Sequence, residues 1–232
     1  MVKKRILIFA LLITILIFIT IYFTNIILNN EREDAIIERM NTILQNYEEM
    51  QTLSMMADVF GQDGTCLIMQ ARLLNMNKDI WETGKKIDQY RTLTEEFMKD
   101  PFYIEQKTRF NINEVLYFSM LKKMQQSCDV NQSTILFFYQ KKEECPNCDA
   151  QSFVLTDIKR EHDQELGIFS FDADLNLAPV NILMQYYNVT ELPCTIINVT
   201  AHCGLYDKDE MMTILCQTED FSDCSEYREQ NT

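Results

Sequence analysis

The feature that most constrains this chain is an uncharged apolar run at its start, residues 6–28. The run is apolar apart from three threonines and one asparagine, and its 23 residues are enough for a helix to cross a hydrocarbon core of about 30 Å. A cleaved signal peptide would have a shorter apolar core followed by small residues at a cleavage site. The run therefore predicts an uncleaved, single-pass transmembrane anchor.

The charges around this run predict its orientation. Lys3, Lys4 and Arg5 precede it, and the acidic stretch "NNEREDA" follows it. By the positive-inside rule, residues 1–5 form a cytoplasmic tip and the rest of the chain lies outside the cytoplasm, in a compartment that is often oxidising. Glycosylation sequons at Asn131, Asn188 and Asn198 are compatible with this location.

The rest of the chain is strongly acidic. The 232 residues have a formal charge of −14, and the three basic residues of the tip leave 18 basic against 35 acidic residues, a net charge of −17. No basic patch is visible, so we expect no nucleic-acid partner. Such a surface mainly keeps the chain soluble and away from anionic lipid.

Residues 29–130 have the apolar spacing of helices. The pattern predicts helices over 31–60, 65–99 and 113–126, with "GQDG" after the first and Asp100-Pro101 ending the second. Asp63 or Thr65 is a candidate cap of the second helix. Two interpretations remain open. The helices pack on one another as a hairpin or three-helix unit, or the first forms a dimerising coiled coil.

The pattern changes at residue 133 to alternating strands and helices. Strands are predicted over 133–140, 167–176 and 194–200, with a fourth starting near Gly204, and helices over 150–166, 177–188 and 207–217. The first of these helices is expected to bury Phe153, Val154 and Ile158, and Asp207 is a candidate cap of the last. This order predicts an α/β fold over residues 131–218, followed by a tail over 219–232.

Two motifs in this part resemble the thioredoxin superfamily. "CPNC" (145–148) follows the first strand, and "YNVTELPCTII" (187–197) carries Pro193 before the third strand, 45 residues after Cys148. The resemblance covers about residues 132–218 and includes a glycine at position 204. It implies a thioredoxin-like fold with a cis bond before Pro193, and it makes Leu192 and Pro193 substrate-binding residues.

The CxxC motif predicts a redox-active dithiol. At a helix N-terminus, unpaired backbone N–H groups stabilise a thiolate, which makes Cys145 the candidate nucleophile and the more buried Cys148 the resolving thiol. Attack by Cys145 would give a mixed disulfide that Cys148 then cleaves. Pro146 suits the first helical turn.

Three features depart from the family pattern. Glu143 and Glu144 precede the motif, where their charge disfavours a thiolate unless Lys141 and Lys142 offset it. The strand "TILFFY" contains none of the buried acid that many relatives use to relay protons. Cys194 directly follows Pro193, as a third redox thiol, a ligand or a small buried side chain.

The eight cysteines allow further arrangements. A zinc site could combine Cys145 and Cys148 with Cys194 and Cys203, although the second pair lacks typical ligand spacing. His162 and His202 are expected at the surface or in a hairpin rather than as ligands. Outside the cytoplasm, Cys66 could pair with Cys128, and Cys216 with Cys224. We expect no metal and no cofactor.

The sequence thus supports two functional hypotheses. The first is a membrane-anchored extracytoplasmic thiol–disulfide oxidoreductase that acts on exported proteins and exchanges electrons with an unidentified redox partner. The second is a non-catalytic thioredoxin-like module that binds a partner protein and holds Cys145–Cys148 as a static disulfide. Reactivity of Cys145 distinguishes them.

Overall fold

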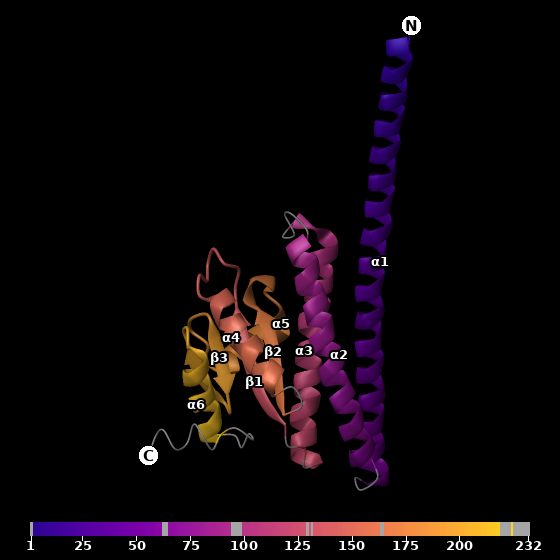
Figure 1. Cartoon of the computed structure of the whole chain (residues 1–232). Coiled ribbons are helices and arrows are strands. Elements are labelled where there is room, and N and C mark those ends of the chain that lie inside the picture. The colour runs from indigo at the N-terminus through magenta and orange to yellow at the C-terminus, as the bar shows by residue number, and fades with distance from the viewer. Residues whose placement is uncertain are drawn as a thin grey trace.

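The structure is a computed structural model, and it describes residues 2–61, 65–93, 99–128, 130, 132–162, 165–218 and 224. Asp63, Asn131 and the tail from residue 219, apart from Cys224, lie outside the described residues, so the expectations made for them stay predictions. The described residues contain six α-helices and one small mixed sheet of four strands. The α/β character expected of the carboxy-terminal part is therefore present, beside a larger helical part (Figure 1).

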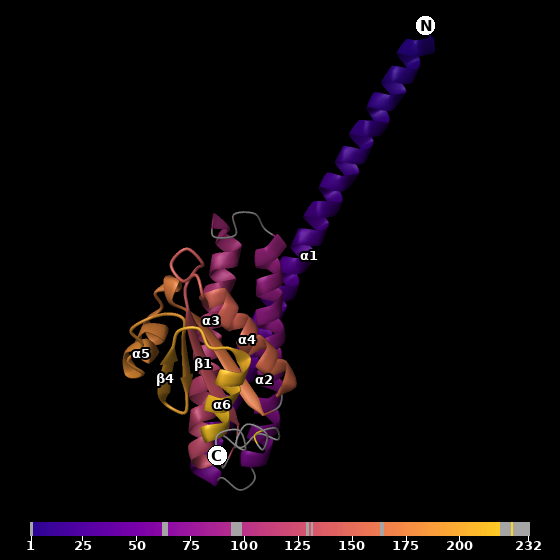
Figure 2. The ribbon, with the colours of Figure 1, turned by 60° about the vertical axis from the view of Figure 1, so that its left-hand side comes forward.

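Helix α1 (Val2–Phe60) is continuous through the predicted anchor and the first helix of the helical region. Among the described residues it is the one helix long and apolar enough to cross a membrane. Its amino-terminal half projects alone from the rest of the molecule (Figures 1 and 2). The hydroxyls of Thr14, Thr20 and Thr24 donate to carbonyls four residues earlier, so these polar groups are satisfied within the helix.

The lower half of α1 packs with α2 (Thr65–Leu93) and α3 (Pro101–Ser127), and each of these helices contacts the other two. The apolar stripe of α1 is buried in this three-helix unit at Ile36, Met40, Ile43 and Met50. The stripe is thus covered within one chain, as the three-helix interpretation predicted. The disulfide Cys66–Cys128 joins the start of α2 to the end of α3, as expected.

The start of α3 differs from the prediction. The helix begins at Pro101 rather than near residue 113, because Asp100 caps it: its side chain accepts from the Phe102 N–H at 2.9 Å. Pro101 occupies the first turn, where a missing N–H has no cost. Asp100-Pro101 therefore starts a helix here, instead of only ending the previous one.

The sheet has the strand order β2-β1-β3-β4. Strands β1 (Ser133–Tyr139) and β2 (Leu166–Asp172) are parallel, while β3 (Cys194–Ile197) is antiparallel to both β1 and β4 (Thr200–Cys203). The fourth strand therefore ends before Gly204 rather than starting there. Gly204 follows it with φ +112°, a conformation that favours glycine.

Helices cover both faces of the sheet. Helices α4 (Cys148–Glu161) and α6 (Lys208–Thr218) pack on one face, against Ile135, Phe137 and Ile197. Helices α3 and α5 (Ala178–Tyr186) cover the other, where Leu136, Phe138 and Phe169 continue the core of the three-helix unit. Because both faces are buried, β1 is apolar along nearly its whole length.

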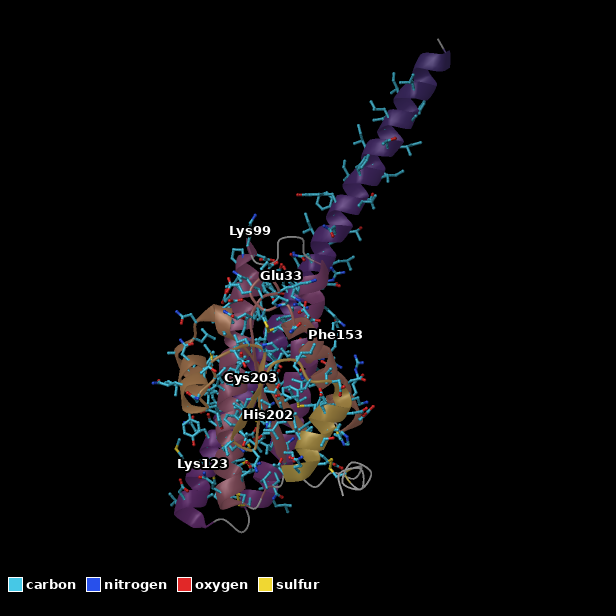
Figure 3. All side chains as sticks on the ribbon, turned by 90° about the vertical axis from the view of Figure 1, so that its left-hand side faces the viewer. Glu33, Lys99, Lys123, Phe153, His202 and Cys203 are labelled. Atoms are coloured by element: carbon cyan, nitrogen blue, oxygen red, sulfur yellow. A yellow bond between two sulfur atoms is a disulfide. The ribbon has the colours of Figure 1, made fainter. Side chains whose placement is uncertain are left out.

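Two expectations for these helices had different outcomes. Ile158 is fully buried in α4, but Phe153 is 75% exposed and lies at the outside of the molecule (Figure 3). The prediction that Phe153 points inward is wrong, because the buried face of α4 runs through Leu155, Ile158 and Lys159. Asp207 does cap α6, since its carboxylate accepts from the Glu210 N–H at 2.9 Å.

Helix α3 also completes the outer edge of the sheet. Strand β2 has a neighbour on one side only, and two of its N–H groups reach side chains of α3. Glu114 Oε1 accepts from Ser170 N, and Asn111 Oδ1 accepts from Asp172 N, each at 2.8 Å. These bonds satisfy backbone donors that an edge strand leaves unpaired.

Candidate dithiol site

The CxxC motif lies in the turn between β1 and α4. Cys145 and Cys148 form a disulfide with a Cα–Cα distance of 5.4 Å. Helix α4 begins only at Cys148, with Asn147 as its N-cap residue, so Cys145 lies just before the helix and not in its first turn. The Cys145 N–H donates to the Lys141 carbonyl at 2.9 Å, and its own carbonyl accepts from the Cys148 N–H at 3.1 Å. The helix N-terminus is therefore nearer Cys148 than the sequence predicted.

Both halves of the disulfide are buried. Cys145 and Cys148 are each 2% exposed, although Pro146 and Asn147 between them are exposed. The prediction that Cys148 is the more buried of the two is therefore wrong for the disulfide. A thiolate from outside would reach the disulfide only after the 141–147 segment moves.

Backbone and side-chain contacts fix the start of the 141–147 segment. The Gln140 N–H points to Cys148 Sγ at 3.5 Å. Asp174, in the short 3-10 turn η2 (Ala173–Leu175) after β2, accepts from the Lys141 N–H at 2.7 Å and from Gln140 Nε2 at 3.2 Å. A donor at a buried sulfur stabilises a thiolate, so this arrangement favours charge on Cys148 once the disulfide opens.

The acidic residues before the motif are partly compensated. Glu143 and Glu144 are exposed, and Lys141 Nζ lies 2.9 Å from Glu144 Oε1. The hydrogen bond and charge of Glu144 raise the pKa of Lys141. One of the two lysines expected to offset the glutamates therefore does pair with one of them.

A buried polar cluster lies beside the end of β1. Tyr139 is the register partner of Asp172, whose Oδ2 is 2.5 Å from Lys107 Nζ of α3. Burial disfavours the Lys107 ammonium, yet its pKa is raised because Tyr139, Asp172 and Tyr103 surround it. Burial also raises the pKa of Glu114 well above its usual value, and this outweighs the Ser170 N–H bond and the Lys107 charge. Strand β1 itself has no acid, as the sequence showed, but α3 and β2 bring two acids close to its end.

The proline segment lies at the same end of the sheet as the CxxC turn. The Leu192–Pro193 peptide bond is cis, as the resemblance implied; Pro193 is buried and Leu192 is half-buried. Cys194 follows as the first residue of β3 and is the register partner of Phe138, two residues before Gln140. The substrate-binding role of Leu192 and Pro193 stays a prediction.

Cys194 is not a free thiol in this structure. It forms a disulfide with Cys203, which is also its register partner in β4. The four cysteines of the zinc alternative are thus joined as two disulfides. Cys216 and Cys224 form the fourth disulfide, as expected, so all eight cysteines are paired.

The two histidines lie in different surroundings. His162, at the end of α4, is 4% exposed, so its expected surface position is wrong. His202 is half-buried in β4, one residue before Cys203 (Figure 3), and burial lowers its pKa. The described residues contain no group of three or more His, Cys, Asp or Glu side chains placed to hold a metal ion.

Sequence reasoning missed four residues of this region: Gln140, Asp174, Lys107 and Glu114. Asp174 carried a usable signal, because it follows a strand that runs parallel to β1 and therefore ends at the same edge of the sheet. Gln140 directly follows β1, and no side-chain pattern distinguished it, because its contact with Cys148 Sγ is made by the backbone N–H. Lys107 and Glu114 carried no signal, since their positions depend on how α3 packs against β2.

Comparison with known proteins adds little. No family model and no curated protein matches the chain. Three chains among the solved structures match. One, titled "Structure of a malarial protein", is 17% identical, with a TM-score of 0.33 and a match that covers 38% of this chain and 97% of that one. A score this low carries no argument about fold or function.

Proposed function

We propose that this chain is a membrane-anchored extracytoplasmic thiol–disulfide oxidoreductase with a thioredoxin-like fold. The observation that carries the proposal is the Cys145–Cys148 disulfide in the turn between β1 and α4, with the Gln140 N–H directed at Cys148 Sγ. The fold assignment is supported by the strand order β2-β1-β3-β4 with helices on both faces. The proposed location outside the cytoplasm is supported by the charges around residues 6–28 and by four disulfides.

The proposed reaction is thiol–disulfide exchange with exported proteins. In the reducing direction, Cys145 as thiolate attacks a substrate disulfide, and one substrate sulfur leaves as a thiolate. Cys148 then attacks Cys145 Sγ, which releases the second substrate thiol and re-forms the Cys145–Cys148 disulfide. The Gln140 N–H stabilises Cys148 as the attacking thiolate, and the buried acids near Tyr139 are candidates for taking up or supplying its proton.

The burial of both cysteines favours a second candidate function. A disulfide that is 2% exposed on each side is protected from attack, as in a non-catalytic binding module with a static disulfide. The two candidates differ in whether the 141–147 segment opens. Because this segment is exposed apart from Cys145 and is held at its start by Asp174, the oxidoreductase requires only a local movement.

Trapping of the mixed disulfide tests the proposed function. The full chain in detergent micelles with Cys148→Ser should accumulate a mixed disulfide between Cys145 and a reduced-and-reoxidised protein substrate, seen on non-reducing gels and mapped by mass spectrometry. Cys145→Ser is the matched control and should trap much less, because Cys148 is the resolving residue. If neither variant forms an adduct, and Cys145 alkylates with the pH profile of an ordinary thiol, the static-disulfide module is the correct function.

The position of the dithiol turn supports a partner at the membrane surface. The loop that joins β1 to α4 lies at the end of the molecule from which the amino-terminal half of α1 projects (Figures 1 and 2). If α1 crosses the membrane through residues 6–28, this loop faces the bilayer. We therefore expect the dithiol to exchange with cysteines held close to the membrane.

Lengthening α1 tests this expectation. Seven helical residues inserted between Asn30 and Glu31 keep the helix phase and move the dithiol about 10 Å farther from the membrane. In liposomes containing a lipid with a thiol headgroup, exchange with that lipid should slow by about tenfold, because the effective concentration of the thiol falls. Reduction by dissolved dithiothreitol should be unchanged. Equal rates of lipid exchange for both lengths would contradict a membrane-surface partner.

A further inference from the structure

A second disulfide, Cys194–Cys203, lies at the same end of the sheet as the CxxC turn. Cys194 begins β3 directly after Pro193, and its register partner on β1 is Phe138. Gln140 directly follows β1, two residues beyond Phe138, and its N–H points to Cys148 Sγ. The disulfides Cys145–Cys148 and Cys194–Cys203 therefore lie at the same end of one sheet, on neighbouring segments.

The two cysteines of the Cys194–Cys203 disulfide differ in exposure. Cys194 is fully buried, between β1 and β4. Cys203 is partly exposed at the end of β4, a strand that has β3 as its one neighbour in the sheet (Figure 3). Cys145 and Cys148 are both buried, so of the four cysteines at this end of the sheet, Cys203 is the one that an outside thiolate meets first.

The β3–β4 hairpin does not depend on this disulfide. The strands pair over four residues, from Cys194↔Cys203 to Ile197↔Thr200. Next to the disulfide, the Gly204 N–H donates to the Pro193 carbonyl at 2.8 Å. At the other end, Asn198 and Val199 form a tight turn with φ of 44° and 67°, values that suit a two-residue hairpin turn. Opening the disulfide therefore leaves both ends of the hairpin closed, which permits repeated reduction and oxidation.

We infer that Cys194–Cys203 is a second exchangeable disulfide, opened by an external dithiol through attack on Cys203. A thiolate of the dithiol bonds to Cys203 Sγ as the Cys194–Cys203 bond breaks, and Cys194 leaves as a thiolate that takes up a proton. The second thiol of the external dithiol then attacks the first sulfur of that dithiol, which is now bonded to Cys203, and Cys203 is released as a thiol. Two electrons and two protons pass to the cysteine pair, and the dithiol leaves as a disulfide.

This inference goes beyond the proposed oxidoreductase function, because it adds a second site that receives electrons. The Cys216–Cys224 disulfide provides an internal reference, because both of its cysteines are buried and it lies at the end of α6, away from this end of the sheet.

A redox titration of all four disulfides tests it. The full chain in detergent micelles is equilibrated with mixtures of reduced and oxidised glutathione, quenched with acid and alkylated, and the reduced fraction of each disulfide is measured by peptide mass spectrometry. We expect Cys194–Cys203 to be half-reduced at a glutathione ratio within about tenfold of that for Cys145–Cys148, while the buried Cys216–Cys224 stays oxidised. If Cys145–Cys148 is reduced and Cys194–Cys203 stays oxidised with Cys216–Cys224, the inference is wrong and the proposed function stands. If Cys194–Cys203 alone is reduced, the inference stands and Cys145–Cys148 is static. If neither is reduced, both fail.

Two matched variants test the point of attack. Cys194→Ser leaves Cys203 as the remaining thiol, and Cys203→Ser leaves Cys194. Incubated with oxidised glutathione, the first variant should form a glutathione adduct at Cys203 at least about tenfold faster than the second forms one at Cys194. Circular dichroism checks that both remain folded. Equal rates would overturn the assignment of Cys203 as the residue attacked.

Discussion

The buried carboxyl group of Glu114 makes a pH-dependent prediction. Glu114 is 2% exposed, its Oε1 accepts from the Ser170 N–H at 2.8 Å, and its Oε2 has no hydrogen-bond partner among the described residues. Because burial raises the pKa of Glu114 well above its usual value of 4.5, the folded chain keeps this proton after the unfolded chain has lost its own. The free energy of unfolding then falls as pH rises from about 4.5 to the folded-state pKa, by about 1.4 kcal/mol per pH unit.

The substitution Glu114→Gln removes this titration while keeping the shape and the acceptor for Ser170. Below pH 4.5 the variant and the wild type should differ by less than about 1 kcal/mol, because both carry an uncharged group at this position. Above that pH the variant should become progressively more stable than the wild type, with a slope of about 1.4 kcal/mol per pH unit until the folded-state pKa is reached.

Urea unfolding of the full chain in detergent micelles measures this difference between pH 4 and pH 8, with the single tryptophan, Trp81, as the fluorescent probe. Glu105→Gln on the same helix is the matched control, since the Glu105 side chain is 57% exposed and pairs with Arg109 at the surface. The free energy of unfolding of this control should stay within about 0.5 kcal/mol of the wild-type value between pH 4 and pH 8. A constant difference between Glu114→Gln and the wild type would refute the reasoning.

Two further pairs of substitutions test the packing of this region. Lys107→Met should lower the free energy of unfolding by about 3–5 kcal/mol, because Asp172 stays buried without its partner, whereas Lys123→Met at an exposed ion pair should change it by less than about 1 kcal/mol. Urea titrations of the two variants compare them, and equal losses would contradict the burial of the Lys107 pair. Ile158→Ala should cost about 2–5 kcal/mol and Phe153→Ala less than about 0.5 kcal/mol, since these α4 residues are 0% and 75% exposed. The shift in Tm by calorimetry checks this, and a larger loss for Phe153 would mean that α4 is rotated on the sheet.

Local patterns predicted most elements of the fold. The apolar run of β1 and the 3–4 spacing of α1 give unambiguous signals, because each depends on residues close together in the sequence. The boundary at Asp100-Pro101 was misread because the same pair can end one helix and cap the next. Phe153 was misplaced because a short helix tolerates one exposed aromatic residue on its outer face.

The candidate site was predictable only where its parts are close in sequence or follow the family pattern. The CxxC motif and Pro193 belong to that group. The Cys66–Cys128 and Cys216–Cys224 pairs were suggested by an oxidising compartment and by their places in the helical region and the tail, with the connectivity left open. The Cys194–Cys203 pair was not predicted, because it depends on the register between β3 and β4. A shift of one residue in that register would move one of the two cysteines to the opposite face of the sheet.

The polar stripe of α3 shows why the rest was hidden. Lys107, Asn111 and Glu114 are spaced i, i+4 and i+7, a pattern typical of the solvated face of a helix. In the structure this face meets the edge of β2, where Asn111 and Glu114 accept from backbone N–H groups and Lys107 pairs with Asp172. Without α3, these donors of β2 would be unpaired, and Asp172 would lose its cation beside Tyr139. Residues on both sides of the boundary near residue 130 therefore form the polar surroundings of the proposed dithiol. The helical region contributes Lys107, Asn111 and Glu114 to these surroundings, and through α1 it is continuous with the apolar segment 6–28.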